Sequence, residues 1–294
     1  MSRLRKLGLG TVQWGLGYGV SNKQGMTPPE IVAQILVAAK EAGVEVLDTA
    51  SLYGESERVL GANRLDGFRI VTKTPRFGTA RITEENCTQL VQVFSQSLQK
   101  LACDKVYGLL CHHVEDLLVP GGDKLWDVMC GLKGAGRVEK VGVSVYDSHQ
   151  VDRLLKKLRP DLIQLPVNVL DQRLLKDGTL ARLHDAGVEI HVRSVFLQGL
   201  LLMPLEQVPS YFAPIRNLLE SWHTAAKSQG LSLVQAALTF VRDIPYIDTV
   251  LVGVENLEQF RACCNDFSHP STFDASGLAC DNPEFLNPAL WKLA

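Results

Sequence analysis

The sequence predicts a (β/α)8 barrel, because short apolar segments alternate with helical ones along the chain. The apolar segments lack the polar alternation of a half-exposed sheet, as expected for parallel strands buried on both faces. These eight segments are 7–11, 45–48, 68–73, 106–111, 140–144, 162–166, 189–194 and 248–252. A doubly wound sheet is the main alternative, but the GxGxxG turn that usually opens its first helix is missing, and Gly15-Leu-Gly17-Tyr-Gly19 leads into the polar loop SNKQG.

Three strands are preceded by the same sequence pattern, in which a helical stretch ends in Ala-Gly and an apolar strand begins within a few residues. The three places are KEAGVEVLD (40–48), KGAGRVEKVGVS (133–144) and HDAGVEIHVRS (184–194). A glycine just past a helix end takes the left-handed conformation that stops the helix at little steric cost. This pattern is typical of repeated βα units rather than of a β-sandwich.

Helical periodicity fills the gaps between the strands. Thr27-Pro-Pro-Glu30 predicts a capping box that opens the first helix, and Thr83 is expected to cap a second long helix. Further helices are expected at 123–135, 148–158, 174–186, 214–229 and 232–242. The helix at 232–242 is an extra one before the eighth strand, and the irregular stretch 265–294 is expected to wrap the barrel. We therefore expect residues 1–294 to form a single domain.

Composition excludes several classes of function. The 294 residues are 46% hydrophobic and carry a formal net charge of −2, which argues against binding to nucleic acid or to anionic membranes. No apolar run approaches the roughly 20 residues of a membrane span, and the glycine-broken N-terminus does not resemble a signal peptide. Seven scattered cysteines without metal spacing indicate reduced thiols in the cytoplasm, so we expect neither disulfides nor a metal site.

Polar residues stand at or just beyond the ends of three consecutive predicted strands. Asp48 ends VEVLD, Tyr53 follows in DTASLYG, Lys73 ends FRIVTK, and His112 ends VYGLLCH. Active-site residues of a barrel come from the C-terminal strand ends and from the loops that follow them. The sequence therefore predicts that these four side chains converge on one site.

These residue types can together form a general acid whose pKa is adjusted by its neighbours. A phenol titrates near ~10, and a nearby ammonium such as Lys73 lowers that pKa. Asp48 is suited to hold Lys73 in an ion pair, and His112 to orient a carbonyl oxygen beside the Tyr53 hydroxyl. Because no side chain donates hydride, such a site requires a cofactor.

The chain resembles the aldo-keto reductases, which are NAD(P)H-dependent oxidoreductases built on a (β/α)8 barrel, and within them the bacterial branch. The resemblance rests on an ordered set of segments: LGLGTVQWG (7–15), DTASLYGESERVLG (48–61), VTKTP (71–75), LLCHH (109–113), GVSVY (142–146), LIQLPVN (162–168) and VLVGVENLEQ (250–259). It implies interconversion of an aldehyde or ketone with the corresponding alcohol. It also implies that Tyr53 is the general acid, Lys73 lowers its pKa, Asp48 pairs with Lys73, and His112 orients the carbonyl.

The resemblance also implies where the cofactor binds. The implied contacts are Gly10, Thr11 and Asp48 beside the nicotinamide, Ser144 and Gln164 at its carboxamide, Arg193 in the stacking position, Ser194, Phe196 and Gln198 under the pyrophosphate, and Gly253, Glu255 and Gln259 at the end of the eighth strand. Aromatic candidates for the substrate pocket, which are equally consistent with ordinary packing, are Trp14, Tyr18, Phe196, Tyr211, Phe212 and Trp291.

The chain departs from the family at several positions. Val145 replaces a frequent asparagine, and Arg193 replaces an aromatic residue that stacks on the nicotinamide, a role that a planar guanidinium can also fill. Many members place Lys or Arg at the end of strand eight against the adenosine 2′-phosphate, where this chain has Gly253, Glu255 and Gln259. A carboxylate there repels a 2′-phosphate and accepts a hydrogen bond from a free ribose hydroxyl. NADPH is therefore expected from family habit, with NADH as its competitor.

We expect a small polar carbonyl substrate, and the resemblance to the bacterial branch suggests a sugar-derived compound. We expect the protein to be a monomer. Two alternatives stay open from the residues alone. One is a regulatory barrel that binds the nucleotide without turnover. The other is a Schiff-base lyase that uses Lys73 as its nucleophile.

Overall fold

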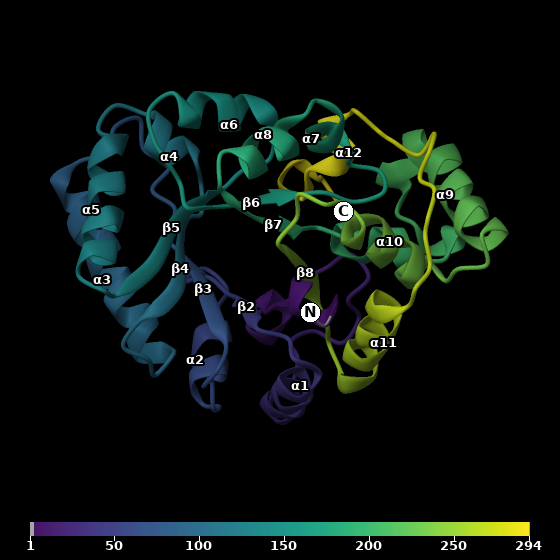
Figure 1. The fold of residues 1–294 in the computed structure, drawn as a ribbon, viewed down its shortest axis with the longest axis horizontal. Coiled ribbons are helices and arrows are strands. Elements are labelled where there is room, and N and C mark those ends of the chain that lie inside the picture. The colour runs from purple at the N-terminus through teal and green to yellow at the C-terminus, as the bar shows by residue number, and fades with distance from the viewer. Residues whose placement is uncertain (1–2, 294) are drawn as a thin grey trace.

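The computed structural model describes residues 3–293 and confirms the predicted (β/α)8 barrel (Figure 1). Eight parallel strands close in sequence order, with β8 paired to β1. The strands are β1 (Leu7–Gly10), β2 (Val46–Asp48), β3 (Arg69–Lys73), β4 (Val106–Cys111), β5 (Val138–Ser144), β6 (Leu162–Pro166), β7 (Glu189–Arg193) and β8 (Thr249–Gly253). Each of them lies within two residues of the segment that the apolar runs predicted.

Helices form the outer ring. They are α1 (Pro29–Ala42), α2 (Ser56–Gly61), α3 (Glu84–Lys100), α4 (Glu115–Leu118), α5 (Gly122–Gly134), α6 (Ser148–Leu155), α7 (Arg173–Lys176), α8 (Thr179–Asp185), α9 (Arg216–Ser228), α10 (Leu233–Arg242), α11 (Leu257–Ser268) and α12 (Pro283–Leu286). Short 3-10 segments lie at Arg3–Lys6, Val12–Trp14, Leu197–Leu202, Leu205–Gln207, Ser210–Ile215 and Pro288–Leu290. None of the helices in residues 3–293 has the length and apolar character needed to cross a membrane.

Some helix predictions need correction. The stretch 174–186 is two helices, because Gly178 takes a left-handed conformation (φ 78°) between α7 and α8. The capping box at Thr27 is wrong: Pro28 is the N-cap of α1, and the buried Thr27 hydroxyl has no hydrogen-bond partner. Thr83 does precede α3 as its N-cap, and its backbone N–H donates to Asn86 Oδ1 (3.0 Å).

The chain enters the C-terminal stretch 265–294 at the end of α11 (Leu257–Ser268), a helix that the sequence did not predict. From its end the chain passes α9 and returns toward α7, so it wraps one side of the barrel (Figure 1). Two hydrogen bonds fix this path: Gln229 Nε2 donates to the Asp274 carbonyl (3.0 Å), and the Cys280 N–H donates to the Leu170 carbonyl (2.8 Å). The extra helix before β8 is α10, which follows α9.

A small apolar cluster fills the barrel and sets the direction of the site residues. Its members are Val46, Val71, Leu110, Leu162 and Leu251, one from each of five strands, and they form a cluster separate from the large core. Side chains on a strand alternate between faces, so a residue two positions further along points the same way. Those positions are Asp48, Lys73, His112, Gln164 and Gly253. The site residues therefore form the next layer above this cluster, at the C-terminal strand ends.

A polar cluster lies at the opposite end of the barrel. Glu189, at the start of β7, accepts hydrogen bonds from Tyr107 Oη (2.6 Å) and from Lys140 Nζ, and it pairs with His191 Nε2 (2.7 Å). Burial would raise the pKa of the Glu189 carboxyl, but these bonds outweigh it and lower the pKa to about 2. This end of the barrel interior is thus occupied by its own side chains.

Candidate active site

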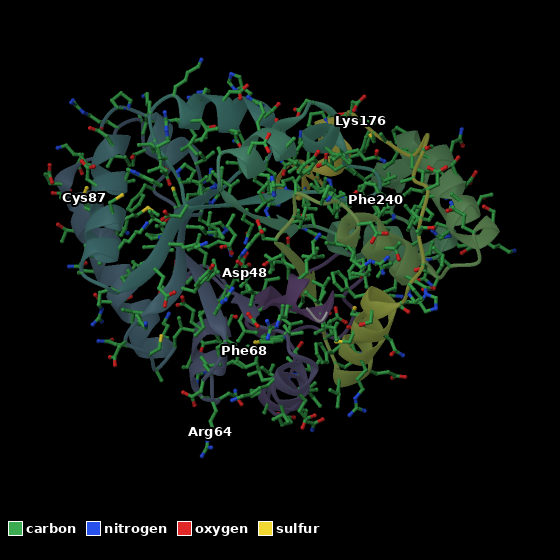
Figure 2. All side chains as sticks on the ribbon, viewed as in Figure 1. Asp48, Arg64, Phe68, Cys87, Lys176 and Phe240 are labelled. Carbon is green, nitrogen blue, oxygen red and sulfur yellow. The ribbon has the colours of Figure 1, made fainter. Side chains whose placement is uncertain are left out.

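The C-terminal strand ends surround a cavity of about 600 Å³. Such a volume is typical of small-molecule and cofactor sites. The cavity is lined by every residue expected at the cofactor: Gly10, Thr11, Asp48, Ser144, Gln164, Arg193, Ser194, Phe196, Gln198, Gly253, Glu255 and Gln259. Tyr53 and His112 also line it, and Asp48 lies near the centre of the molecule (Figure 2).

Asp48 and Lys73 form a buried ion pair at the base of the cavity. The Lys73 Nζ atom lies 2.8 and 2.7 Å from the two Asp48 carboxylate oxygens and 2.8 Å from the Thr49 carbonyl. Lys73 is 2% exposed and Asp48 is 4% exposed. Gln164 Nε2 adds a hydrogen bond to Asp48 Oδ1 (2.7 Å), so three strands are joined at one carboxylate. Burial lowers the pKa of the Lys73 ammonium, and Asp48 opposes this effect.

Tyr53 is positioned by a turn that packs tightly against the loop after β1. A Cβ atom on Gly15 would lie 1.9 Å from the Tyr53 carbonyl oxygen, so only glycine allows the two backbones to come this close. The Ser51 hydroxyl donates to the Lys73 carbonyl (3.1 Å) and ties the turn to β3. Lys73 Nζ then lies 5.0 Å from the centre of the Tyr53 ring.

The tuning of Tyr53 differs from the expectation that Lys73 lowers its pKa. Burial raises the pKa of the phenol well above its ordinary value, the Asp48 carboxylate raises it further, and Arg193 opposes both. The main physical reason is burial of the phenol, and Lys73, which is paired with Asp48, does not offset it.

His112 faces Tyr53 as a neutral imidazole. The two rings meet edge to face with centroids 5.8 Å apart. Burial, assisted by the charge of Lys73, lowers the pKa of His112 to about 2. Its Nδ1 atom is buried without a hydrogen-bond partner, so this nitrogen is an unsatisfied polar atom in the wall of the cavity. His113 also lines the cavity, with its ring 5.1 Å from that of His112.

Arg193 and Tyr146 stack on each other in the opposite wall. The guanidinium carbon of Arg193 lies 4.2 Å from the centre of the Tyr146 ring, and the guanidinium donates to the Val145 carbonyl (3.1 Å) and to Ser194 Oγ (3.3 Å). Sequence reasoning did not select Tyr146. An aromatic residue two positions after a strand-end serine was the available signal, but nothing in the sequence ties it to Arg193.

The segment after β7 crosses the cavity in an unusual backbone conformation. Ser194, Leu197 and Gln198 have left-handed φ values of 61°, 48° and 55°, which are costly for residues with side chains and cluster at functional sites. Gln198 Nε2 donates to the Tyr18 hydroxyl (2.8 Å), and its carbonyl accepts from the Val20 N–H (3.0 Å). The loops after β1 and β7 are therefore joined over the cavity.

The end of β8 forms the remaining side. Gly253 lies against Gln13, whose amide atoms would be about 2.5 Å from an added Cβ. Asn256 caps α11 by accepting from the Gln259 N–H (2.8 Å), and Gln259 Oε1 accepts from the Glu255 N–H (2.8 Å). The Gln259 side chain thus fixes the backbone that presents Glu255 to the cavity.

The aromatic candidates separate into two groups. Tyr18 and Phe196 line the cavity. Trp14 is fully buried, with its Nε1 donating to the Val254 carbonyl (3.1 Å). Tyr211, Phe212 and Trp291 pack on one another, with centroids 5.1 and 4.9 Å apart, and are not among the lining residues. The interpretation as packing residues holds for these last four.

The fold and the site correspond to a class of carbonyl–alcohol oxidoreductases. The model of the aldo/keto reductase family matches residues 6–276, so the chain belongs to this family. It is 24% identical to aldo-keto reductase YhdN of Bacillus subtilis (strain 168) over 283 residues, which cover 87% of this chain and 83% of that protein. It is 27% identical to the glyoxal reductase of the same organism over 173 residues, 56% of this chain and 58% of that protein.

Solved structures support the fold. Aldo-keto reductase AKR11C1 from Bacillus halodurans, in its holo form, superposes with a TM-score of 0.71 at 20% identity and covers 98% of this chain and 93% of its own. The glycerol dehydrogenase AKR11B4 of Gluconobacter oxydans superposes with a TM-score of 0.68 at 18% identity, with coverages of 92% and 88%. The family implies a nicotinamide cofactor. The cavity volume and the polar residues at the strand ends fit such a group.

Proposed function

We propose that the protein reduces a small aldehyde or ketone with a nicotinamide dinucleotide, and that Tyr53 is the general acid. The observation that carries the proposal is the arrangement of Tyr53 and neutral His112, which meet edge to face at the cavity while the Lys73–Asp48 pair lies beneath the phenol. Bound in the cavity, the reduced dinucleotide supplies the hydride.

The high pKa of Tyr53 suits a late proton transfer. A buried phenol keeps its proton against a neutral carbonyl and gives it up when the oxygen gains the charge of an alkoxide. His112 orients that oxygen through a hydrogen bond from its neutral ring. Lys73, held by Asp48 and Thr49, lies 5.0 Å from the centre of the phenol ring and keeps Tyr53 in place.

Residues on the other strands hold the dinucleotide in this proposal. Ser144 and Gln164 bind the carboxamide, Gly10 and Thr11 line the ring, and the segment with Ser194, Phe196 and Gln198 covers the pyrophosphate, all of them lining the cavity. We propose NADPH as the dinucleotide, because members of the family commonly use it, with NADH as the alternative. Two features favour NADH: Arg193 is the only lysine or arginine among the described residues that line the cavity, and the carboxylate of Glu255 lies at the end of β8, where a 2′-phosphate would be repelled.

The substrate in this proposal is a small polar carbonyl compound, with a sugar-derived aldehyde as the first class to test. The similarity to a protein named glyoxal reductase supports adding small dicarbonyls. We also propose a cytoplasmic location, because all seven cysteines carry free thiols, as expected in a reducing compartment.

The proposal is tested by titrating purified protein with NADPH and NADH, followed by a panel of aldehydes with the tighter-binding dinucleotide. We expect turnover in the wild type and loss of at least ~10²-fold in Tyr53→Phe, with nucleotide binding unchanged, because the phenol acts on the proton alone. Absence of micromolar nucleotide binding would refute the reductase function. Binding without turnover on any carbonyl would support a regulatory barrel, and borohydride trapping of substrate on Lys73 would support a Schiff-base lyase.

The dinucleotide preference has its own test. Glu255→Arg is expected to shift binding toward NADPH by roughly tenfold, because it replaces a repelling carboxylate by a guanidinium that pairs with a phosphate. Glu258→Arg, a charge reversal on an exposed side chain of α11 that does not line the cavity, is the matched control. An equal shift in both variants would show that Glu255 does not contact the dinucleotide.

A further inference from the structure

Arg193 is the one lysine or arginine among the described residues that line the cavity, and it has no carboxylate partner. Lys73 is paired with Asp48. Arg173, in α7, donates to both oxygens of Asp171 at 2.8 and 2.9 Å. Across residues 3–293 no carboxylate lies within ion-pair distance of Arg193. A guanidinium stays charged at any physiological pH, so the cavity wall carries one uncompensated positive charge.

The position of this charge is fixed by its neighbours. Arg193 is half-buried, one face of its guanidinium lies on the Tyr146 ring, and its edge donates to the Val145 carbonyl and the Ser194 hydroxyl. A cation–π contact and two hydrogen bonds leave the side chain little freedom to swing into solvent. The charge is therefore a permanent feature of the wall.

Strand order places Arg193 across the barrel from the acid–base residues. In a closed barrel of eight strands, β7 is four strands from β3 in either direction, so Arg193 faces the Lys73 side. The residues that act on the carbonyl, Tyr53 and His112, follow β2 and β4 on either side of Lys73. The charge of Arg193 reaches both: it opposes the burial that raises the pKa of Tyr53, and it adds to the burial that lowers the pKa of His112.

This arrangement determines what lies against Arg193 during the reaction. A carbonyl that takes its proton from Tyr53 lies on the β2–β4 wall. Ser144 and Gln164, which would hold the carboxamide in the proposed function, are register partners at the ends of β5 and β6. Arg193 ends the next strand, β7, opposite Pro166 of β6, so a nicotinamide held there would lie on the β5–β7 wall, where Arg193 is the charged group.

We propose that Arg193 makes the site discriminate between the two redox states of the nicotinamide, so that the neutral reduced ring binds tightly and the cationic oxidised ring binds weakly. Each reduction moves a hydride from the ring to the carbonyl carbon and a proton from Tyr53 to the carbonyl oxygen, and the ring is left with one positive charge. That charge meets the Arg193 guanidinium. Like-charge repulsion favours release of the oxidised dinucleotide and directs the site toward carbonyl reduction. This inference rests on the proposed function.

The test is the ratio of dissociation constants for the oxidised and reduced forms of the same dinucleotide, measured by calorimetry at fixed ionic strength without substrate. Arg193→Gln and Arg193→Met remove the charge, and Arg193→Lys keeps it. We expect the oxidised-to-reduced ratio to fall at least about tenfold in both neutral variants, the size expected of two like charges in a partly solvated cavity. The lysine variant is expected to keep most of the wild-type ratio.

Two results would overturn the inference while leaving the proposed function intact. One is an unchanged oxidised-to-reduced ratio of dissociation constants in Arg193→Gln and Arg193→Met when these variants bind dinucleotide. The other is a fall of this ratio in Arg193→Lys as large as the fall in the neutral variants. If wild-type protein binds neither redox form, the proposed function itself fails, and the inference fails with it. Thermal unfolding followed by circular dichroism identifies a variant that does not fold. The two neutral side chains differ in polarity, so the test does not depend on a single substitution.

Discussion

Replacing Lys73 by methionine leaves the Asp48 carboxylate as an unpaired buried charge. Methionine has a similar length and fits the space of the lysine stem. The substitution removes both contacts to the carboxylate (2.8 and 2.7 Å) and the only side-chain donor to the Thr49 carbonyl that we observe. Of the side-chain hydrogen bonds to the Asp48 carboxylate that we observe, only that from Gln164 remains (2.7 Å). The structure therefore predicts that Lys73→Met, a substitution of a buried residue, causes a large loss of stability.

The size of the loss follows from burial. Asp48 and Lys73 are 4% and 2% exposed, so solvent does not replace the missing partner. Removing one member of a buried pair costs about 3–5 kcal/mol, and the retained Gln164 bond places this case near the lower end, at about 3 kcal/mol. The measurement is equilibrium urea unfolding at pH 7 without dinucleotide, because a ligand that binds only the folded state would mask part of the loss.

The double variant Asp48→Asn/Lys73→Met separates an unpaired charge from a packing defect. Asparagine keeps the shape of Asp48 and an acceptor for Gln164, and it removes the charge. We expect the double variant to regain most of the stability and to lie within about 1–2 kcal/mol of the wild type. A double variant as unstable as Lys73→Met, or a single variant that loses less than about 1 kcal/mol, would refute the reasoning.

Two further predictions concern the residues around this pair. Gly15→Ala places a Cβ atom 1.9 Å from the Tyr53 carbonyl oxygen, so the Tyr53 turn must move, and we expect the catalytic rate to fall about 10²-fold or more in steady-state assays. His112 is held neutral with its pKa lowered to about 2, so the unfolded state binds a proton that the folded state does not. Stability is then full above pH ~6.5 and falls by about 1 kcal/mol per pH unit below it, and His112→Asn should flatten that slope between pH 6 and 4.

Each of these has a control in the same chain. Gly17→Ala lies in the same loop, where an added Cβ has its nearest neighbour 3.6 Å away, and should keep its activity. Equal losses in both glycine variants would mean that the loop tolerates no side chain and that Tyr53 is not the cause. For the pH slope, the exposed His149 in α6 provides the comparison. A slope that persists in His112→Asn but disappears in His149→Gln would contradict the assignment.

The strands and the convergence of the acid–base residues could be predicted because both follow from local rules. Apolar runs ended by a polar residue define β2 and β3, and alternation along each strand directs Asp48 and Lys73 to the same interior. The errors were also local. The Asp177-Gly178 pair that separates α7 from α8 is a recognisable stop signal, and α11 opens with Asn256 as its cap. The first signal was outweighed by the longer helical pattern of 174–186, and the second lies where no helix was expected.

The properties of the site that could not be predicted depend on side chains that are distant in sequence. Arg193 lies on Tyr146 and donates to Val145, which is 48 positions away, and nothing in either segment specifies that contact. The pKa of Tyr53 likewise depends on its burial and on the nearby charges of Asp48 and Arg193, which residue type alone does not specify. Positions of the candidate groups were therefore predictable, whereas their electrostatic state required the structure.

This distinction separates the roles of the two cations, Lys73 and Arg193, at the cavity. If Lys73 were free, its charge would dominate the phenol, the carbonyl and the cofactor together. Because Asp48 lies within 2.8 Å of it at both oxygens, the pair contributes a dipole, and a dipole loses influence with distance faster than a charge does. Arg193 has no such partner, and its charge acts on both Tyr53 and His112, although the charge of Lys73 contributes more at His112. Substitutions at Lys73 should therefore act mainly through stability and the position of Tyr53, and substitutions at Arg193 through the charge state of the bound ligand.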